Sequence, residues 1–100
     1  MRKIVLMCAG GMSTSILVKK MQEAAEAMNY ECTIAAYPTS EAPTEGKDAD
    51  IILLGPQVRF QVSKIKSQCP GVIVEPIEMR MYGRMDGKSV LEFAKAKLGD

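Results

Sequence analysis

The chain has 100 residues, of which 47% are hydrophobic and 25% are charged, and its formal net charge is +1. This length predicts a single domain spanning residues 1–100, and the composition excludes an intrinsically disordered chain. The nearly balanced charge excludes an extended basic surface for nucleic acid or for a charged membrane. No stretch approaches the roughly 20 apolar residues of a membrane span, so we predict no direct membrane insertion.

Histidine is absent from the sequence, and cysteine occurs three times. The lack of imidazole excludes histidine-based acid–base catalysis, histidine–metal sites and phosphohistidine chemistry within this chain. Cys8, Cys32 and Cys69 are odd in number and far apart, which argues against a disulfide framework or a four-ligand zinc site. Such thiols are typical of a reducing cytosol, so we expect a cytoplasmic protein without a bound metal.

The first half of the chain predicts two strands with a helix between them. The apolar run Lys3–Met7 predicts the first strand. A helix follows, because apolar residues recur at helical spacing at Leu17, Met21, Ala24 and Met28. Glu31–Ala36 predicts the second strand, and the proline-containing segment Pro38–Asp48 predicts an irregular crossover or a short helical turn.

The second half repeats this pattern. The strand predicted at Asp50–Leu54 is continuously apolar in its last four residues, as expected for a parallel strand covered on both faces. A helix beginning at Pro56 is indicated by the stripe of Val58, Val62, Ile65 and Cys69. Val72–Glu75 predicts the fourth strand. The last helix has the stripe Leu91, Ala94 and Leu98, with Asp86 or Ser89 as its N-cap and Gly99 beyond its end.

Alternating strands and helices predict an α/β fold, with an open four-stranded parallel sheet flanked by helices on both faces. Ligands of such sheets bind beyond the carboxyl ends of the strands. Three segments should meet at that edge, namely Cys8–Thr14, Gly55–Gln57 and Pro76–Met85. We therefore expect the chemistry of the protein in these three loops.

The loop after the first strand has a sequence suited to an anion. Its residues are Cys8, Ala9, Gly10, Gly11, Met12, Ser13, Thr14 and Ser15. The glycines allow a tight turn, and the amides and positive dipole at the start of the next helix favour a negatively charged group. The same field favours a thiolate at Cys8. We predict that Cys8 is a nucleophile for a phosphoryl group, that residues 9–15 bind the phosphate, and that one of the three hydroxyl residues is the helix N-cap.

Other interpretations stay open for several of these residues. A cysteine at the end of a strand can be a small core residue, which is the interpretation that we favour for Cys32 and Cys69. Phe60 and the methionines of the last loop could form a docking surface or pack against neighbouring loops. The segment Gly87–Ser89 resembles the end of a nucleotide-binding loop, but its spacing from Gly83 is wrong, so nucleotide binding is not expected.

The loop at residues 8–15 resembles the active loop of IIB components of the phosphoenolpyruvate-dependent sugar phosphotransferase system, of the lactose/cellobiose (chitobiose) type. Leu54–Gln57 and Tyr82–Gly87 resemble two further blocks of that family, and the similarity covers the whole chain. The resemblance implies a small cytoplasmic phosphocarrier with a four-stranded parallel sheet. In it, Cys8 would take phosphate from a phosphohistidine of the IIA protein and pass it to a sugar, such as a β-linked disaccharide, held by the membrane IIC protein. The resemblance implies no cofactor, metal or nucleotide.

Low-molecular-weight tyrosine phosphatases carry a similar phosphate loop, with the pattern C-x-x-x-x-x-R. Thr14 stands where their arginine would be, so a hydrolytic transition state would lose its strongest clamp. Asp86 lies in the right loop for a general acid, but we interpret it as a helix cap. A phosphatase-like enzyme is therefore the alternative function, and a non-catalytic, anion-binding regulatory module is a second alternative.

Overall fold

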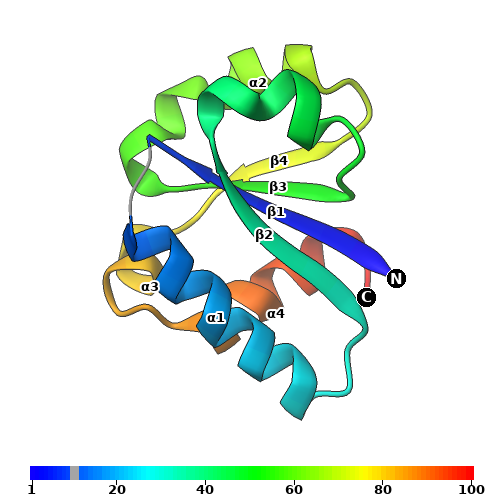
Figure 1. Cartoon of the computed structure of the whole chain (residues 1–100), viewed down its shortest axis with the longest axis vertical. Helices are drawn as coiled ribbons and strands as arrows, with labels where there is room; N and C mark the ends of the chain where they lie inside the picture. The colour runs from blue at the N-terminus through cyan, green and yellow to red at the C-terminus, as the bar shows by residue number, and fades with distance from the viewer. Residues whose placement is uncertain (10–11) are drawn as a thin grey trace.

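The computed structural model describes residues 1–9 and 12–100, with only the main chain of residues 12 and 13 (Figure 1). Its strands are β1 (Arg2–Cys8), β2 (Cys32–Pro38), β3 (Ile51–Leu54) and β4 (Ile73–Pro76). They form one sheet in the order β2-β1-β3-β4, and every neighbouring pair runs parallel. This confirms the predicted four-stranded parallel sheet. The strand β1 extends one residue further than predicted at each end and includes Arg2 and Cys8.

Helices lie between these strands and after the last of them. They are α1 (Met12–Ala27), α2 (Val62–Gln68), α3 (Met79–Gly83) and α4 (Gly87–Leu98). Three short segments of other helical types are η1 (Thr39–Glu41), η2 (Ala42–Gly46) and η3 (Pro56–Gln61). The segments η1 and η2 occupy the crossover predicted at Pro38–Asp48. Within the described part of the chain, no helix is long and apolar enough to cross a membrane.

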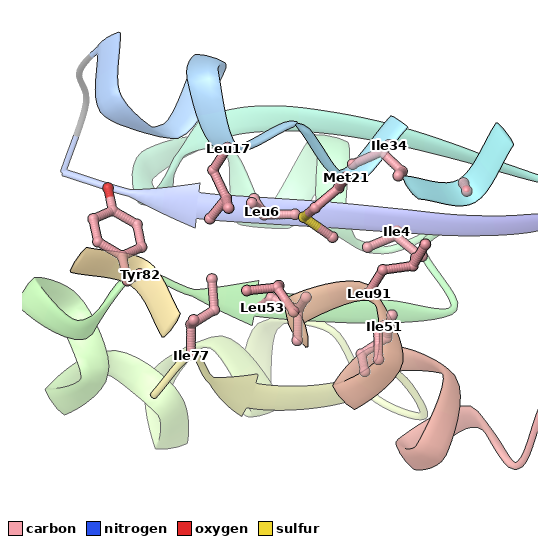
Figure 2. Packing of buried hydrophobic residues seen from close by; sticks show 13 residues of the cluster. Ile4, Leu6, Leu17, Met21, Ile34, Ile51, Leu53, Ile77, Tyr82 and Leu91 are labelled. Atoms are coloured by element: carbon pink, nitrogen blue, oxygen red, sulfur yellow. The ribbon is translucent and has the colours of Figure 1, made fainter. Parts of the chain in front are cut away.

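The two faces of the sheet carry separate cores, because successive side chains of a strand point to opposite sides. Ile4 and Leu6 of β1 belong to the first core, whereas Val5 and Met7 belong to the second. The first core lies between the sheet and α1, α3 and α4, and the second lies under η2, η3 and α2 (Figure 1). The expectation of helices on both faces is confirmed. Figure 2 shows the first core from close by.

The helix predicted to begin at Pro56 is interrupted. Val58 has a non-helical main chain (φ −118°, ψ 19°), and its amide donates a hydrogen bond to the Gly55 carbonyl at 3.0 Å. The segment η3 is therefore divided at Val58 into two short pieces of 3-10 helix, and α2 begins only at Val62. Val58 and Ile65 are both buried in the second core, as their shared apolar stripe predicted, although the main chain between them is not one regular helix.

The ends of α4 follow local rules. Asp86 is its N-cap, because the carboxylate accepts the Ser89 amide at 3.1 Å and the Ser89 hydroxyl at 2.8 Å. The alternative N-cap at Ser89 is wrong, since Ser89 lies inside the first turn. Gly99 ends the helix in the left-handed conformation, with φ 82°. The helix α3 was expected as loop, because five residues are too few to show an apolar period.

The order of the strands locates the site. The chain passes from β1 outward to β2 and then returns to pair β3 with the other side of β1. The direction of winding therefore changes between β1 and β3. In open parallel sheets, the crevice at such a reversal is where ligands bind. Cys8 at the end of β1 and Gly55 after β3 stand at this point.

Candidate active site

Three loops converge at the reversal point, as the sequence predicted. The Gly55 amide donates to the Met7 carbonyl at 2.9 Å, which holds the end of β3 against β1. A Cβ atom on Gly55 would lie 3.4 Å from Cβ of Cys8 and 3.6 Å from the ring of Tyr82. The residue after β3 is thus in contact range of both the first and the last of the predicted loops.

A buried hydroxyl group lies against the sulfur of Cys8. Oγ1 of Thr14 donates a hydrogen bond to Sγ of Cys8 at 2.9 Å. Thr14 is only 2% exposed and is the one buried polar residue among those described. A buried hydroxyl requires a partner, and here the partner is the predicted nucleophile. Thr14 therefore lies at the site, whereas its predicted contact with phosphate stays a prediction.

The start of α1 differs from the expectation. The helix begins at Met12, so Ser13, Thr14 and Ser15 all lie in its first turn. An N-cap residue precedes the first helical residue, so the prediction that one of these hydroxyl residues is the cap is wrong. Gly10 and Gly11, which were predicted to bind phosphate through their amides, lie outside the described residues. Ala9 is described and exposed.

Cys8 is 6% exposed, so little of its surface faces solvent. The next residue, Ala9, is exposed, so the chain leaves the core immediately after the cysteine. Low exposure alone would also fit a core cysteine. The donation by Thr14 distinguishes Cys8 from a purely apolar residue, because a hydroxyl hydrogen bond stabilises negative charge on sulfur.

The other two cysteines lie away from this edge. Cys32 begins β2 and pairs with Arg2, six residues and therefore about 20 Å along the strand from the level of Cys8. Cys69 is buried in the second core, and its thiol donates to the Ala42 carbonyl at 3.2 Å. Burial raises the pKa of both the Cys32 and the Cys69 thiol. The core role predicted for Cys69 is confirmed, whereas Cys32 is half-buried at the edge of the first core.

Titratable side chains do not form a metal site in the described part of the chain, where no group of three His, Cys, Asp or Glu residues could hold an ion. Asp86, the alternative general acid, uses both carboxylate oxygens to cap α4. The hydrogen bonds from Ser89 hold the pKa of this carboxyl below its usual range. Asp86 is thus ionised and engaged, which does not suit a proton donor.

Apolar side chains are exposed around this end of the sheet. Phe60 of η3 is 77% exposed, Met79 of α3 is 68% exposed, and Ile16 near the start of α1 is about half exposed. Met81 and Met85 instead pack against the first core. A hollow of about 390 Å³ lies beside Met79, with walls that include Pro56 and Phe93. The packing interpretation is thus confirmed for Met81 and Met85, whereas docking by the exposed Phe60 and Met79 stays a prediction.

Sequence reasoning missed one residue of the site. Tyr82 of α3 is 8% exposed, and its hydroxyl oxygen lies 3.1 Å from Oγ1 of Thr14. Figure 2 shows its side chain directed toward the end of β1. The available signal was topological, since a tyrosine in the loop after β4 had to lie near the carboxyl edge of the sheet. Its contact with Thr14, 68 residues away, had no local signature.

A family model described as "PTS system, Lactose/Cellobiose specific IIB subunit" matches residues 3–93. The chain belongs to this family. The resemblance drawn from the three sequence blocks is therefore confirmed. This IIB subunit is a component of the sugar phosphotransferase system, in which IIB components are phosphotransferases that act in the transfer of phosphate to sugar.

Curated relatives match over nearly the full length of the IIB subunit. It is 41% identical over 96 residues to the oligo-beta-mannoside-specific EIIB component of Bacillus subtilis, covering 94% of this chain and 93% of the relative. It is also 41% identical over 99 residues to the galactose-specific EIIB component of Lactococcus lactis subsp. cremoris and to the cellobiose-specific EIIB component of Lactococcus lactis subsp. lactis. Each of these two matches covers 92% of both chains.

Solved structures agree with this assignment. The cellobiose-specific IIB component from Borrelia burgdorferi superposes with a TM-score of 0.80 at 32% identity, covering 98% of this chain and 92% of that chain. The lactose-specific IIB domain from Streptococcus pneumoniae superposes with a TM-score of 0.83 at 20% identity, covering 93% of each chain. The second likeness supports the fold alone.

Proposed function

We propose that this IIB subunit is a cytoplasmic phosphocarrier in which Cys8 carries the phosphoryl group. Cys8 accepts it from a phosphohistidine of the IIA protein and passes it to a sugar held by the membrane IIC protein. The observation that carries the proposal is the hydrogen bond from the Thr14 hydroxyl to Sγ of Cys8, at the reversal point of the sheet. Family membership supports the overall reaction.

The first transfer is an in-line displacement. The thiolate of Cys8 attacks the phosphorus of the donor, the S–P bond forms, and the P–N bond to the donor imidazole breaks. The imidazole nitrogen keeps the electron pair of that bond. Charge spreads over the three equatorial oxygens, so catalysis depends on donors that are already in position. The Thr14 hydroxyl and the amides at the start of α1 are suited to this role.

The second transfer reverses the geometry. A sugar hydroxyl oxygen attacks the phosphorus, the O–P bond forms, and the S–P bond breaks. Cys8 leaves as a thiolate, and a general base of the sugar-binding partner takes the hydroxyl proton. Because the thiolate is restored, the protein is ready for another cycle without any reductant or cofactor.

Two residues favour transfer of the phosphoryl group to a second partner over its hydrolysis by water. Thr14 stands where related phosphatases have an arginine, so the forked cation that stabilises a hydrolytic transition state is missing there. Asp86 is held as a helix cap and is not poised to protonate a leaving group. A carrier gains from both features, because its phosphocysteine must survive until the second partner binds.

We propose a β-linked disaccharide as the sugar. Two relatives are named as specific for oligo-beta-mannoside and cellobiose, and a third for galactose. Their identities to this chain are equal, so the names do not rank the sugars. Since the sugar is held by the IIC protein, the choice among these sugars is expected to lie with that partner.

Intact-mass measurement tests the carrier role. The protein is incubated with phosphoenolpyruvate and the upstream phosphotransferase proteins, including IIA. We expect a gain of one phosphate that is lost in Cys8→Ser and kept in the control Cys32→Ser. Undiminished labelling of Cys8→Ser would overturn the proposal. Rapid release of inorganic phosphate, from the labelled protein or from an aryl phosphate, would instead support the phosphatase.

The exposed apolar side chains around Cys8 are proposed as the surface that meets both partners. Phe60 and Met79 lie on η3 and α3, which begin two and three residues after the ends of β3 and β4. We expect the double variant Phe60→Ser/Met79→Ser to raise the KM for phosphorylated IIA several-fold without loss of folding. The control Glu23→Ala/Glu26→Ala alters exposed residues in the second half of α1. Equal KM values for the two double variants would contradict this surface.

A further inference from the structure

Tyr82 takes part in a chain of hydrogen bonds that ends at the reactive sulfur. Its hydroxyl oxygen lies 3.1 Å from Oγ1 of Thr14, and Oγ1 of Thr14 lies 2.9 Å from Sγ of Cys8. All three residues are buried, so water does not compete freely for these groups. The chain links α3, the first turn of α1 and the end of β1.

The direction of the protons follows from the chemistry of a hydroxyl group. A threonine hydroxyl has one proton to donate and two lone pairs that accept. The single proton of Thr14 is donated to Cys8. Its oxygen can therefore only accept in the contact with Tyr82, so the phenol donates. Both O–H bonds of the chain point toward the sulfur.

We propose that Tyr82 is a positioning residue for Cys8, acting through Thr14. A hydroxyl rotates about its C–O bond unless its contacts fix it. Donation from Tyr82 occupies the threonine oxygen on one side and leaves the proton of Thr14 aimed at sulfur. A thiolate accepts such a bond more strongly than a thiol does, and donation into the threonine strengthens the bond further. This inference rests on the proposed role of Cys8 as the phosphoryl acceptor.

The position of the phenol is set by packing and not by its own hydrogen bond. The ring belongs to the first core, together with Leu17 and Ile77 (Figure 2). A Cβ on Gly55 would lie 3.6 Å from the ring, which is an ordinary packing distance, so the ring lies beside the Gly55 main chain. Removal of the hydroxyl alone should therefore leave the ring in place, which makes Tyr82→Phe a clean test.

The test measures the alkylation of Cys8 by iodoacetamide as a function of pH, with the modified cysteine identified by peptide mapping. Tyr82 and Cys8 are the two titratable groups of the hydrogen-bonded chain. We expect Tyr82→Phe to slow alkylation at neutral pH about threefold to tenfold, the effect of losing one such bond. The midpoint of the pH–rate profile should move to higher pH. A merely structural role for Tyr82 would not move this midpoint.

A double-mutant cycle tests whether the effect passes through Thr14. Thr14→Val should slow alkylation at least as much as Tyr82→Phe does. Adding Tyr82→Phe to Thr14→Val should then change nothing further. In Thr14→Ser, which keeps the hydroxyl, Tyr82→Phe should still slow the reaction. Tyr30→Phe is the matched control, since it also removes a hydrogen-bonded phenol hydroxyl, but one that donates to Asp100 and not to Thr14.

An unchanged profile in folded Tyr82→Phe would overturn the inference. So would an equal effect of Tyr82→Phe in the presence and absence of the Thr14 hydroxyl. Urea denaturation identifies the conditions in which each variant is folded. The difference in alkylation rate between Thr14→Ser and Thr14→Val measures the effect of the Thr14–Cys8 hydrogen bond without any change at Tyr82. Alkylation needs no phosphoryl donor, so an unchanged alkylation profile leaves the carrier role standing. A failure of Cys8 labelling would instead remove the carrier role and, with it, the purpose proposed for positioning Cys8.

Discussion

Gly87, the first residue of α4, lies directly against the main chain of Lys20 in α1. A Cβ atom built on Gly87 would be 2.5 Å from the carbonyl carbon of Lys20 and 2.6 Å from the amide nitrogen of Met21. The two helices thus touch backbone to backbone at this point. The contact joins the helix that carries Thr14 to the start of α4, four residues after the end of α3, so it helps to hold the two hydroxyl groups together.

Replacement of this glycine should loosen the helix pair. We expect Gly87→Ala to destabilise the fold by about 1–3 kcal/mol, because the new methyl group meets main-chain atoms that cannot rotate away. Urea denaturation measures the change. Gly83→Ala is the control, since a Cβ there would meet nothing within 4 Å. A stability for Gly87→Ala equal to that of Gly83→Ala would contradict the close approach.

The N-cap of α4 gives a prediction that separates structure from catalysis. Asp86→Ala removes the acceptor of the Ser89 amide and hydroxyl, and should lower Tm by about 4 °C or more. The rate of phosphoryl acceptance from IIA should stay unchanged, because Asp86 acts as a cap. Asp86→Ser should recover much of the lost Tm, since serine also caps helices. A general acid would show the opposite pattern, with a lost rate and little change in Tm.

Acid stability should depend on Asp100. The Arg2 guanidinium donates two hydrogen bonds of 2.9 Å to this carboxylate, and together with Tyr30 it lowers the pKa of Asp100 to about 2. An unfolded aspartate titrates near pH 3.9, so this stabilisation is fully present above about pH 4. This stabilisation is lost as the pH falls through the pKa of Asp100 in the folded protein, which is about 2. The free energy of unfolding of Asp100→Asn should therefore fall less steeply than that of the wild type between about pH 4 and pH 2.

The comparison for that experiment is Asp48→Asn, an exposed aspartate of the crossover after η2. It should keep the slope of the wild-type curve. Parallel curves for wild type and Asp100→Asn would show that the contact with Arg2 has no effect in solution. Added salt should also weaken the Asp100 effect, because the ion pair is near the surface.

Alkaline titration should single out Tyr30. Burial, followed by its hydrogen bond to Asp100, raises the pKa of this phenol to about 12. An unfolded tyrosine titrates near pH 10, so the stabilisation is present below about pH 10 and is lost as the pH rises through 12. In a spectrophotometric titration, Tyr30→Phe should lose the absorbance step near pH 12. Persistence of that step in the variant would assign it to another tyrosine.

Much of the fold was readable from hydrophobic spacing. The continuous apolar character of Ile51–Leu54 predicted a strand buried on both faces, and all four residues are buried. The spacing of Leu17 and Met21 predicted the face of α1 that packs on the sheet, and both residues lie in the first core. These patterns are local, because the period of a strand or helix fixes which side of it is apolar. The interruption at Val58 was missed, since a kink keeps the apolar residues while it changes the main chain.

The sequence alone determined that Cys8 ends a buried strand and that glycines and hydroxyl residues follow it, because these relations join neighbours along the chain. Only the tertiary structure decided that the Thr14 hydroxyl points at sulfur and that Tyr82 stands behind it. That second relation spans 68 residues and depends on where the chain places α3 after β4 and on how α4 packs against α1. A side chain's orientation in such a contact is set by the surrounding core, which no local spacing of residues can encode.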